Sequence, residues 1–133
     1  MKLLVALALA FAAFAAHAQT QEVPDWFPES FLEFPQDVKE AARDRKRLML
    51  YFWQDGCLAC RRMKETTLAD PATVSRVRAQ FIPVALNVFG ERGLIWTDGR
   101  TLREKELARE LGIRGTPTLL FLERRFGDGS GGG

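Results

Sequence analysis

The chain contains two cysteines, Cys57 and Cys60, which are separated by Leu58 and Ala59. Thiols at this spacing can exchange a pair of electrons by cycling between a dithiol and a disulfide. If Cys57 lies at the start of a helix, both sulfurs face the same side and can close a small ring. The positive end of the helix dipole then favours the thiolate form of Cys57. The spacing therefore predicts a redox-active pair.

Two other interpretations of the cysteine pair stay open. In an oxidising compartment Cys57 and Cys60 can form a structural disulfide, although so short a loop gains little unfolded-state entropy. Tetrahedral zinc requires about four ligands, and the only histidine, His17, lies in an N-terminal segment that we expect to be removed. We therefore favour redox function, and we expect neither a metal nor a cofactor.

The segments that flank the pair predict a strand before it and a helix after it. The continuously apolar run at residues 48–53 indicates a strand that is buried on both faces. Residues 54–56 predict a turn, and the helix that follows runs from Cys57 to about Leu68. Before the strand, Asp37 is expected to cap a helix at residues 37–47.

Strands and helices alternate along the rest of the chain. Asp70 and Pro71 are typical of a helix start, and Pro83 indicates that the next strand is irregular or at an edge. Residues 101–104 match a capping box, and Gly112 is expected to end the helix that follows. The expected elements are a helix to residue 80, a strand at 81–88, a polar insertion at 89–100, a helix to 111 and a strand at 118–122. This alternation predicts one α/β domain with helices covering a sheet.

The N-terminus has the pattern of a secretory signal peptide. A positive start at Lys2 is followed by an apolar stretch at residues 3–16, and Ala16, His17 and Ala18 form a small-residue cleavage pattern. We therefore predict a signal peptide at residues 1–18 and export of the chain. An uncleaved membrane anchor is the alternative.

The charge balance and length set further expectations. The formal net charge of +2, with both signs interspersed, gives no reason to expect binding to nucleic acid or to a membrane surface. Residues 19–133 are enough for one domain with its own core. We expect an N-terminal arm at residues 19–36, the domain at 37–126 and a flexible glycine-rich tail at 127–133.

Two segments together resemble the thioredoxin-fold pattern. They are residues 51–60, Tyr-Phe-Trp-Gln-Asp-Gly-Cys-Leu-Ala-Cys, and residues 115–118, Gly-Thr-Pro-Thr. More closely, this pattern is similar to periplasmic thioredoxin-like proteins of the SoxW type, which are associated with bacterial sulfur oxidation. The long insertion before residue 104 and the strand entry at residues 116–118 also resemble that group. The resemblance covers about residues 37–123. It implies a three-layer α/β fold with a mixed central sheet. It also implies that the protein is located in the periplasm.

The resemblance also implies roles for particular residues. Cys57 corresponds to the exposed attacking cysteine, and Cys60 corresponds to the resolving cysteine. Pro117 corresponds to a cis-proline beside the disulfide, with a trans proline that opens the strand as the alternative. The residues expected to support the site and contact the substrate are Thr116, Pro117, Trp53 and Gly56.

The chain departs from the family pattern at several positions. Tyr51 replaces the buried aspartate that moves a proton to or from the resolving thiol, and we interpret it as a core aromatic with a hydrogen-bonded hydroxyl. Gly56 replaces a tryptophan, and Leu58 and Ala59 replace a Gly-Pro pair, so the redox potential is expected to differ from that of ordinary thioredoxin. After Gly127 nothing corresponds to the closing strand and terminal helix, which we expect to be missing.

Residue pattern and resemblance together predict an exported thiol–disulfide oxidoreductase that reduces disulfides of periplasmic proteins through Cys57 and Cys60. Arg61 is expected to add positive potential, whereas Arg62 and Lys64 are interpreted as solvated helix-face charges. We expect a monomer. By resemblance, we also expect it to receive electrons from a membrane thiol-electron transporter of the CcdA or DsbD kind. A non-catalytic thioredoxin-fold interaction module and an inactive truncated product are the alternatives.

Overall fold

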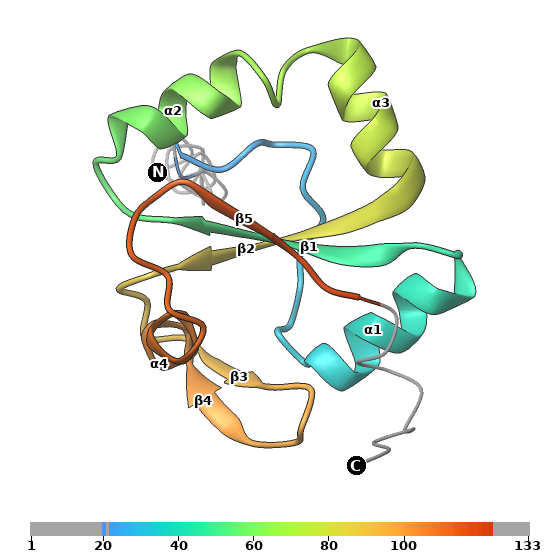
Figure 1. The fold of residues 1–133 in the computed structure, drawn as a ribbon, viewed down its shortest axis with the longest axis vertical. Coiled ribbons are helices and arrows are strands. Elements are labelled where there is room, and N and C mark those ends of the chain that lie inside the picture. Colours follow the sequence, from blue (N-terminus) through green and yellow to red (C-terminus); the bar gives the residue numbers. More distant parts are fainter. Residues whose placement is uncertain (1–19, 21, 124–133) are drawn as a thin grey trace, which may run out of the picture.

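The computed structural model describes residue 20 and residues 22–123 (Figure 1). The predicted signal peptide at residues 1–18 and the glycine-rich tail at 127–133 lie outside the described residues. The expected absence of a closing strand and helix concerns positions after Glu123 and lies outside them as well. Among the described helices, none combines the length and apolar character needed to cross a membrane.

A mixed sheet forms the centre of the fold. Its strand order within the described residues is β2-β1-β5. The central strand β1 (Arg47–Trp53) pairs in parallel with β2 (Phe81–Asn87) and antiparallel with β5 (Thr118–Phe121). Pro83 lies on β2, at one edge of this sheet, where a residue without an N–H costs least. The predicted mixed α/β architecture is confirmed.

The side chains of β1 alternate between two cores. Leu48, Leu50 and Phe52 belong to one buried cluster, whereas Tyr51 and Trp53 belong to another on the opposite face. This is the alternation expected of a pleated strand, and all six residues from 48 to 53 are buried. The continuous apolar run is therefore explained by burial on both faces, as predicted.

Helices cover both faces of the sheet and give three layers (Figure 1). On one face lie α2 (Leu58–Glu65) and α3 (Pro71–Gln80). On the other lie α1 (Phe34–Arg43), α4 (Glu104–Glu110) and a hairpin of β3 (Gly93–Ile95) and β4 (Thr101–Arg103).

The predicted start of α3 is confirmed. The Asp70 carboxylate accepts a hydrogen bond from the Thr73 N–H at 2.9 Å, and Pro71 occupies the first turn, where its missing N–H is not needed. Gly112 follows α4 with a φ of 69°, the left-handed conformation that commonly ends a helix.

Two predicted helix starts are wrong. The first helix begins at Phe34 rather than at Asp37, because Pro35 fits the first turn and the buried Phe34 ring packs edge-on against Trp96 at 5.0 Å. Asp37 lies inside the first turn of α1. The capping box predicted at residues 101–104 is also displaced, since Thr101 belongs to β4. The Glu106 carboxylate instead accepts from the Arg103 N–H at 2.7 Å.

Candidate active site

The cysteine pair lies where β1 turns into α2. The turn at residues 54–56 ends at Gly56, whose φ of 73° is readily adopted by glycine. Cys57 is the N-cap of α2, and its sulfur accepts a hydrogen bond from the Cys60 N–H at 3.1 Å. Cys57 and Cys60 form a disulfide with a Cα–Cα distance of 5.2 Å. The predicted helix-start position of the pair is therefore confirmed.

The two cysteines differ in exposure. Cys57 retains 7% of its surface, whereas Cys60 is fully buried. Beside them the Leu58 side chain is 73% exposed and projects from the first turn of α2. A partner approaching this surface reaches the Cys57 sulfur before it reaches the Cys60 sulfur.

The loop before β5 approaches the same sulfur. The antiparallel pairing of β5 with β1 aligns Thr118 with Phe52, close to the C-terminal end of β1. The Thr116–Pro117 peptide bond is cis, and the Thr116 hydroxyl donates a hydrogen bond to the Cys57 sulfur at 3.3 Å. The structure therefore brings Thr116 and Cys57 together.

Trp53 is the last residue of β1 and packs in the same core cluster as both cysteines. Its side chain is buried, and its indole nitrogen has no hydrogen-bond partner among the described residues. Trp53 therefore supports the cysteine turn through apolar packing in this cluster. Gly56 shapes the turn through its backbone, and a side chain there would meet conformational strain rather than a neighbouring atom.

Tyr51 is a buried core residue with a satisfied hydroxyl, as predicted. Its hydroxyl donates a hydrogen bond to the backbone carbonyl of Glu22 at 2.7 Å. Burial, and to a smaller extent the Glu22 carboxylate, raise the pKa of Tyr51 to about 12. The phenol therefore stays protonated at neutral pH and cannot act as a base there.

Glu22 is a site residue that the sequence did not reveal. It lies in the segment before α1 and is 4% exposed, and its Oε1 accepts hydrogen bonds from the Gly56 N–H at 3.2 Å and from Arg61 Nε at 3.1 Å. These partners are 34 and 39 positions away in the chain. No local spacing pattern signals such contacts, so only the fold could show them.

Two of the basic residues of α2 are paired with this segment. Arg61 forms an ion pair with Glu22, and Lys64 Nζ lies 3.6 Å from Asp25 Oδ1. The positive potential expected from Arg61 is therefore compensated by a buried carboxylate. Lys64 is not a freely solvated charge but half of a surface ion pair.

A groove borders the cysteine turn on the side of the Thr116 loop. Its volume is about 270 Å³. It is lined by Thr116, Gln54, the largely exposed Phe89, and three basic residues, Lys105, Arg109 and Arg114. Lys105 is paired with Glu91, whereas Arg109 and Arg114 form no ion pair with the described residues. The groove therefore combines an exposed aromatic side chain with positive charge.

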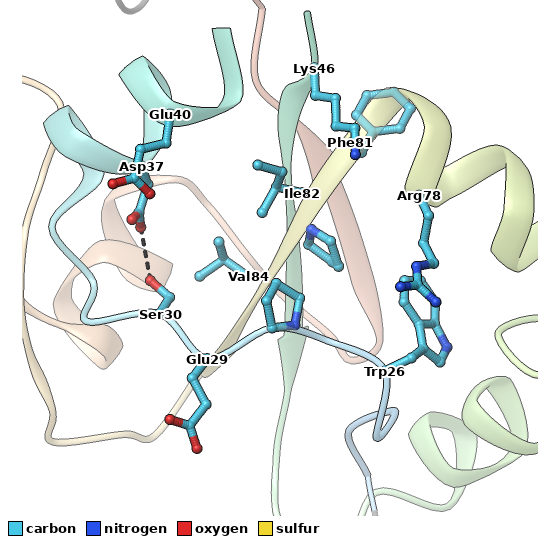
Figure 2. A pocket seen from close by; sticks show the side chains of 12 residues that line it. Trp26, Glu29, Ser30, Asp37, Glu40, Lys46, Arg78, Phe81, Ile82 and Val84 are labelled. Atoms are coloured by element: carbon cyan, nitrogen blue, oxygen red, sulfur yellow. Dashed lines mark hydrogen bonds between the residues drawn. The ribbon is translucent and has the colours of Figure 1, made fainter. Parts of the chain in front are cut away.

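A second cavity, of about 350 Å³, lies along β2 and is shown in Figure 2. Its walls include Asp37, Lys46, Arg78 and Val84. Burial raises the pKa of Asp37, an effect that a hydrogen bond from Ser30 at 2.8 Å partly offsets. None of the residues lining this cavity belongs to the cysteine turn or to the Thr116 loop, so it is separate from the candidate site.

The described residues offer no alternative centre for a metal. Within residue 20 and residues 22–123, no group of three or more His, Cys, Asp or Glu side chains is arranged to hold a metal ion. The chemistry that the site can perform with its own groups is thiol–disulfide exchange, because the two sulfurs form a disulfide and Cys57 retains a small exposed surface.

Comparison with known proteins agrees with this geometry. The chain is 28% identical over 111 residues to a thiol:disulfide interchange protein DsbD from Vibrio vulnificus (strain YJ016), covering 84% of this chain and 17% of that protein. The chain therefore spans only a small part of the length of this relative.

Two solved structures are similar in fold. A thioredoxin from Thermus thermophilus is similar over 68% of this chain and 61% of its own, with a TM-score of 0.50 and 28% identity. A thioredoxin-fold protein from Helicobacter pylori matches 63% of this chain and 56% of its own, with a TM-score of 0.55 and 18% identity. The second likeness concerns the fold alone.

The family model of the thioredoxin-like domain matches residues 34–129, which include both cysteines and the Thr116–Pro117 loop. This match covers well over half of the chain, and the three-layer fold agrees with it. The chain belongs to the thioredoxin-like domain family.

Proposed function

We propose that this chain is an exported thiol–disulfide oxidoreductase that reduces disulfides of periplasmic proteins through Cys57 and Cys60. The observation that carries the proposal is the setting of the Cys57 sulfur. It lies at the start of α2 and accepts hydrogen bonds from the Cys60 N–H and the Thr116 hydroxyl. Donors placed in this way stabilise a thiolate when the disulfide is reduced.

The order of the reaction steps follows from the exposure of the two cysteines, because only Cys57 retains exposed surface. In the reduced chain the Cys57 thiolate attacks one sulfur of a client disulfide, forms a mixed disulfide and releases the other client sulfur as a thiolate. Cys60 then loses its proton and attacks the Cys57 sulfur, which re-forms the Cys57–Cys60 disulfide and releases the second client thiolate. Two electrons pass to the client, and its two thiolates take up two protons.

Return to the dithiol state requires an electron donor of the same chemical class, a protein dithiol. We propose that a membrane thiol-electron transporter of the CcdA or DsbD kind supplies it. The relative named as a thiol:disulfide interchange protein DsbD supports this link, although the similarity covers 17% of that protein. A monomer with one accessible cysteine is suited to alternating between donor and client.

Export is part of the same proposal and rests on the residue pattern of positions 1–18. The similarity to SoxW-type proteins likewise rests on the sequence pattern. Periplasmic clients follow from both, because disulfides persist in that compartment and require dedicated reductants. Fractionation of cells that produce the tagged full chain tests the location. Recovery in the periplasmic fraction supports the proposal, and recovery only in the cytosol contradicts it.

Cysteine variants of the full chain test the reaction. We expect the unmodified chain to reduce a labelled peptide disulfide with dithiothreitol as electron donor, and Cys57→Ser to lose this activity entirely. Cys60→Ser should retain the first step and accumulate a mixed disulfide with the peptide, which mass spectrometry detects. Equal activity of Cys57→Ser and the unmodified chain would overturn the proposal.

A further inference from the structure

The segment before α1 places a buried carboxylate against the cysteine turn. A single oxygen of Glu22, Oε1, accepts hydrogen bonds from the Gly56 N–H and from Arg61 Nε. Gly56 directly precedes Cys57, and Arg61 directly follows Cys60. One carboxylate therefore links the residues on either side of the redox pair.

The position of this carboxylate is fixed by the core. The Tyr51 hydroxyl holds the Glu22 carbonyl at 2.7 Å, and the Phe27 ring packs edge-on against the Tyr51 ring at 5.6 Å. Further along the segment, the Trp26 indole N–H donates to the Leu68 carbonyl at 2.8 Å. The segment is thus anchored at three points, which fix the backbone from which the Glu22 side chain extends toward Gly56 and Arg61.

The negative charge of Glu22 disfavours a second negative charge on the nearby cysteine pair. The buried Glu22 charge interacts more strongly with its neighbours than an exposed charge would, because the local dielectric constant around it is low. The carboxylate compensates the Arg61 guanidinium and occupies the Gly56 N–H, and both groups would otherwise favour negative charge near the Cys57 sulfur. Glu22 therefore makes the Cys57 thiolate less favourable than it would be beside a neutral side chain.

The redox consequence follows from the reduced state. A thiol–disulfide pair becomes more oxidising when its thiolate is stabilised, and more reducing when its thiolate is not. We propose that Glu22 is a positioning residue that holds the turn and Arg61 and makes the Cys57–Cys60 pair more reducing. This inference rests on the proposed exchange function and names a residue that tunes its reduction potential.

The test compares Glu22→Gln with the unmodified full chain at equilibrium with glutathione. The amide retains an oxygen for the Gly56 N–H but removes the charge. We expect the ratio of dithiol to disulfide to increase at least threefold at a fixed glutathione ratio. At about 30 mV per tenfold change, this equals a shift of about 14 mV toward oxidising potentials. In a Cys60→Ser background, the pH midpoint for alkylation of Cys57 should fall in parallel.

Asp25→Asn is the matched control, because Asp25 lies in the same segment and also pairs with a basic residue of α2 but is 64% exposed. Its equilibrium constant should equal that of the unmodified chain. Arg61→Gln should shift the ratio the opposite way, toward the disulfide, because it leaves the carboxylate uncompensated. Arg61 is 37% exposed on the surface of α2, so this variant is expected to keep the fold.

The outcomes separate the possible explanations. Equilibrium constants within twofold of the unmodified chain for both Glu22→Gln and Arg61→Gln would overturn the role of Glu22, provided that both melt cooperatively. If Glu22→Gln does not melt cooperatively, Arg61→Gln decides alone, and an unchanged constant overturns the inference. A complete lack of exchange in the unmodified chain would instead overturn the proposed function.

Discussion

The Thr116 hydroxyl donates a hydrogen bond to the Cys57 sulfur across 3.3 Å and so joins two residues that are 59 positions apart. The pairing of β5 with β1 makes this possible, since it carries the preceding loop to the end of β1 where the cysteine turn begins. The sulfur thereby has one backbone donor from its own helix and one side-chain donor from a distant loop. Removal of the second donor should change reactivity without removing either cysteine.

Thr116→Val should slow thiol–disulfide exchange. Valine keeps the shape of threonine but lacks the hydroxyl that stabilises the Cys57 thiolate. A net contribution of about 1 kcal/mol for such a hydrogen bond corresponds to roughly a fivefold decrease in rate. The measurement is the rate of Cys57 alkylation in a Cys60→Ser background, with Thr97→Val as a control away from the loop. An unchanged rate would show that the hydroxyl has no part in activating the sulfur.

Tyr51→Phe should lower the free energy of unfolding. The substitution removes the hydroxyl that satisfies the Glu22 carbonyl, and a buried carbonyl left without a donor costs about 1–3 kcal/mol. Urea unfolding near pH 8, where tyrosine is protonated in both states because its ordinary pKa is about 10, measures this cost. A difference close to zero would mean that water replaces the hydroxyl without loss.

The same variant should change the response to alkaline pH. The pKa of Tyr51 is raised to about 12 in the folded chain, whereas the unfolded value is about 10. Between these values the unfolded chain releases the phenol proton and the folded chain retains it, so the folded state loses stability as pH rises. Tyr51→Phe lacks this loss. The difference in unfolding free energy between Tyr51→Phe and the unmodified chain should therefore be smaller near pH 11 than near pH 8. A difference that stays constant between these pH values would contradict the raised pKa.

Gly90→Ala should destabilise the chain through Glu104. An added methyl group at Gly90 would overlap the Glu104 carboxylate, which is 1% exposed and accepts from the Asn87 N–H at 2.7 Å. Displacement of this carboxylate would also break its pairing with Arg92. We expect a loss of about 2 kcal/mol or more in unfolding free energy.

Gly93→Ala is the matched control for this substitution. Gly93 lies nearby on β3, and an added methyl group there meets no atom within 4 Å. Its effect should stay within about 0.5 kcal/mol. If both variants lose equal stability in urea unfolding, backbone effects rather than the Glu104 carboxylate would explain the loss.

The groove beside the Thr116 loop should favour clients with acidic residues near the disulfide. Arg109 and Arg114 line it without an ion pair to the described residues, so an acidic peptide finds uncompensated positive charge. The double variant Arg109→Gln, Arg114→Gln should lower kcat/KM for a glutamate-flanked peptide disulfide by about tenfold and leave a glutamine-flanked peptide unchanged.

Salt and a distant variant provide the controls for the groove. Added salt should reduce the preference for the acidic peptide in the unmodified chain, because exposed charges are screened. Arg78→Gln removes a charge beside the cavity of Figure 2 and should leave the preference intact. Equal kcat/KM for both peptides in the unmodified chain would rule out charge recognition by the groove.

Features encoded by neighbouring residues were predictable from the sequence. The apolar run of β1, the Asp70–Pro71 start of α3 and the cysteine spacing each carry their signal within a few positions, and the structure agrees. The start of α1 was less predictable because Asp37 is a good capping residue, whereas the actual start depends on the packing of Phe34 against Trp96.

Contacts over long sequence distances were not predictable in the same way. The residues next to Glu22 in the sequence predict an ordinary exposed acidic side chain. Glu22 becomes buried only because the segment before α1 packs over Tyr51. The hairpin of β3 and β4 was similarly concealed in a polar, glycine-containing insertion, because strands of three residues carry little periodicity. The Thr116 contact was expected only from family resemblance.

The equilibrium reduction potential of the Cys57–Cys60 pair tests the central claim most directly. The unmodified full chain is equilibrated with defined ratios of reduced and oxidised glutathione or dithiothreitol, and its free thiols are counted by alkylation and mass spectrometry. If the chain is a reductase, we expect reversible conversion between disulfide and dithiol with a potential of about −270 mV. A potential near about −120 mV would make the chain an oxidant, and a disulfide that never equilibrates with either couple would contradict a redox function altogether.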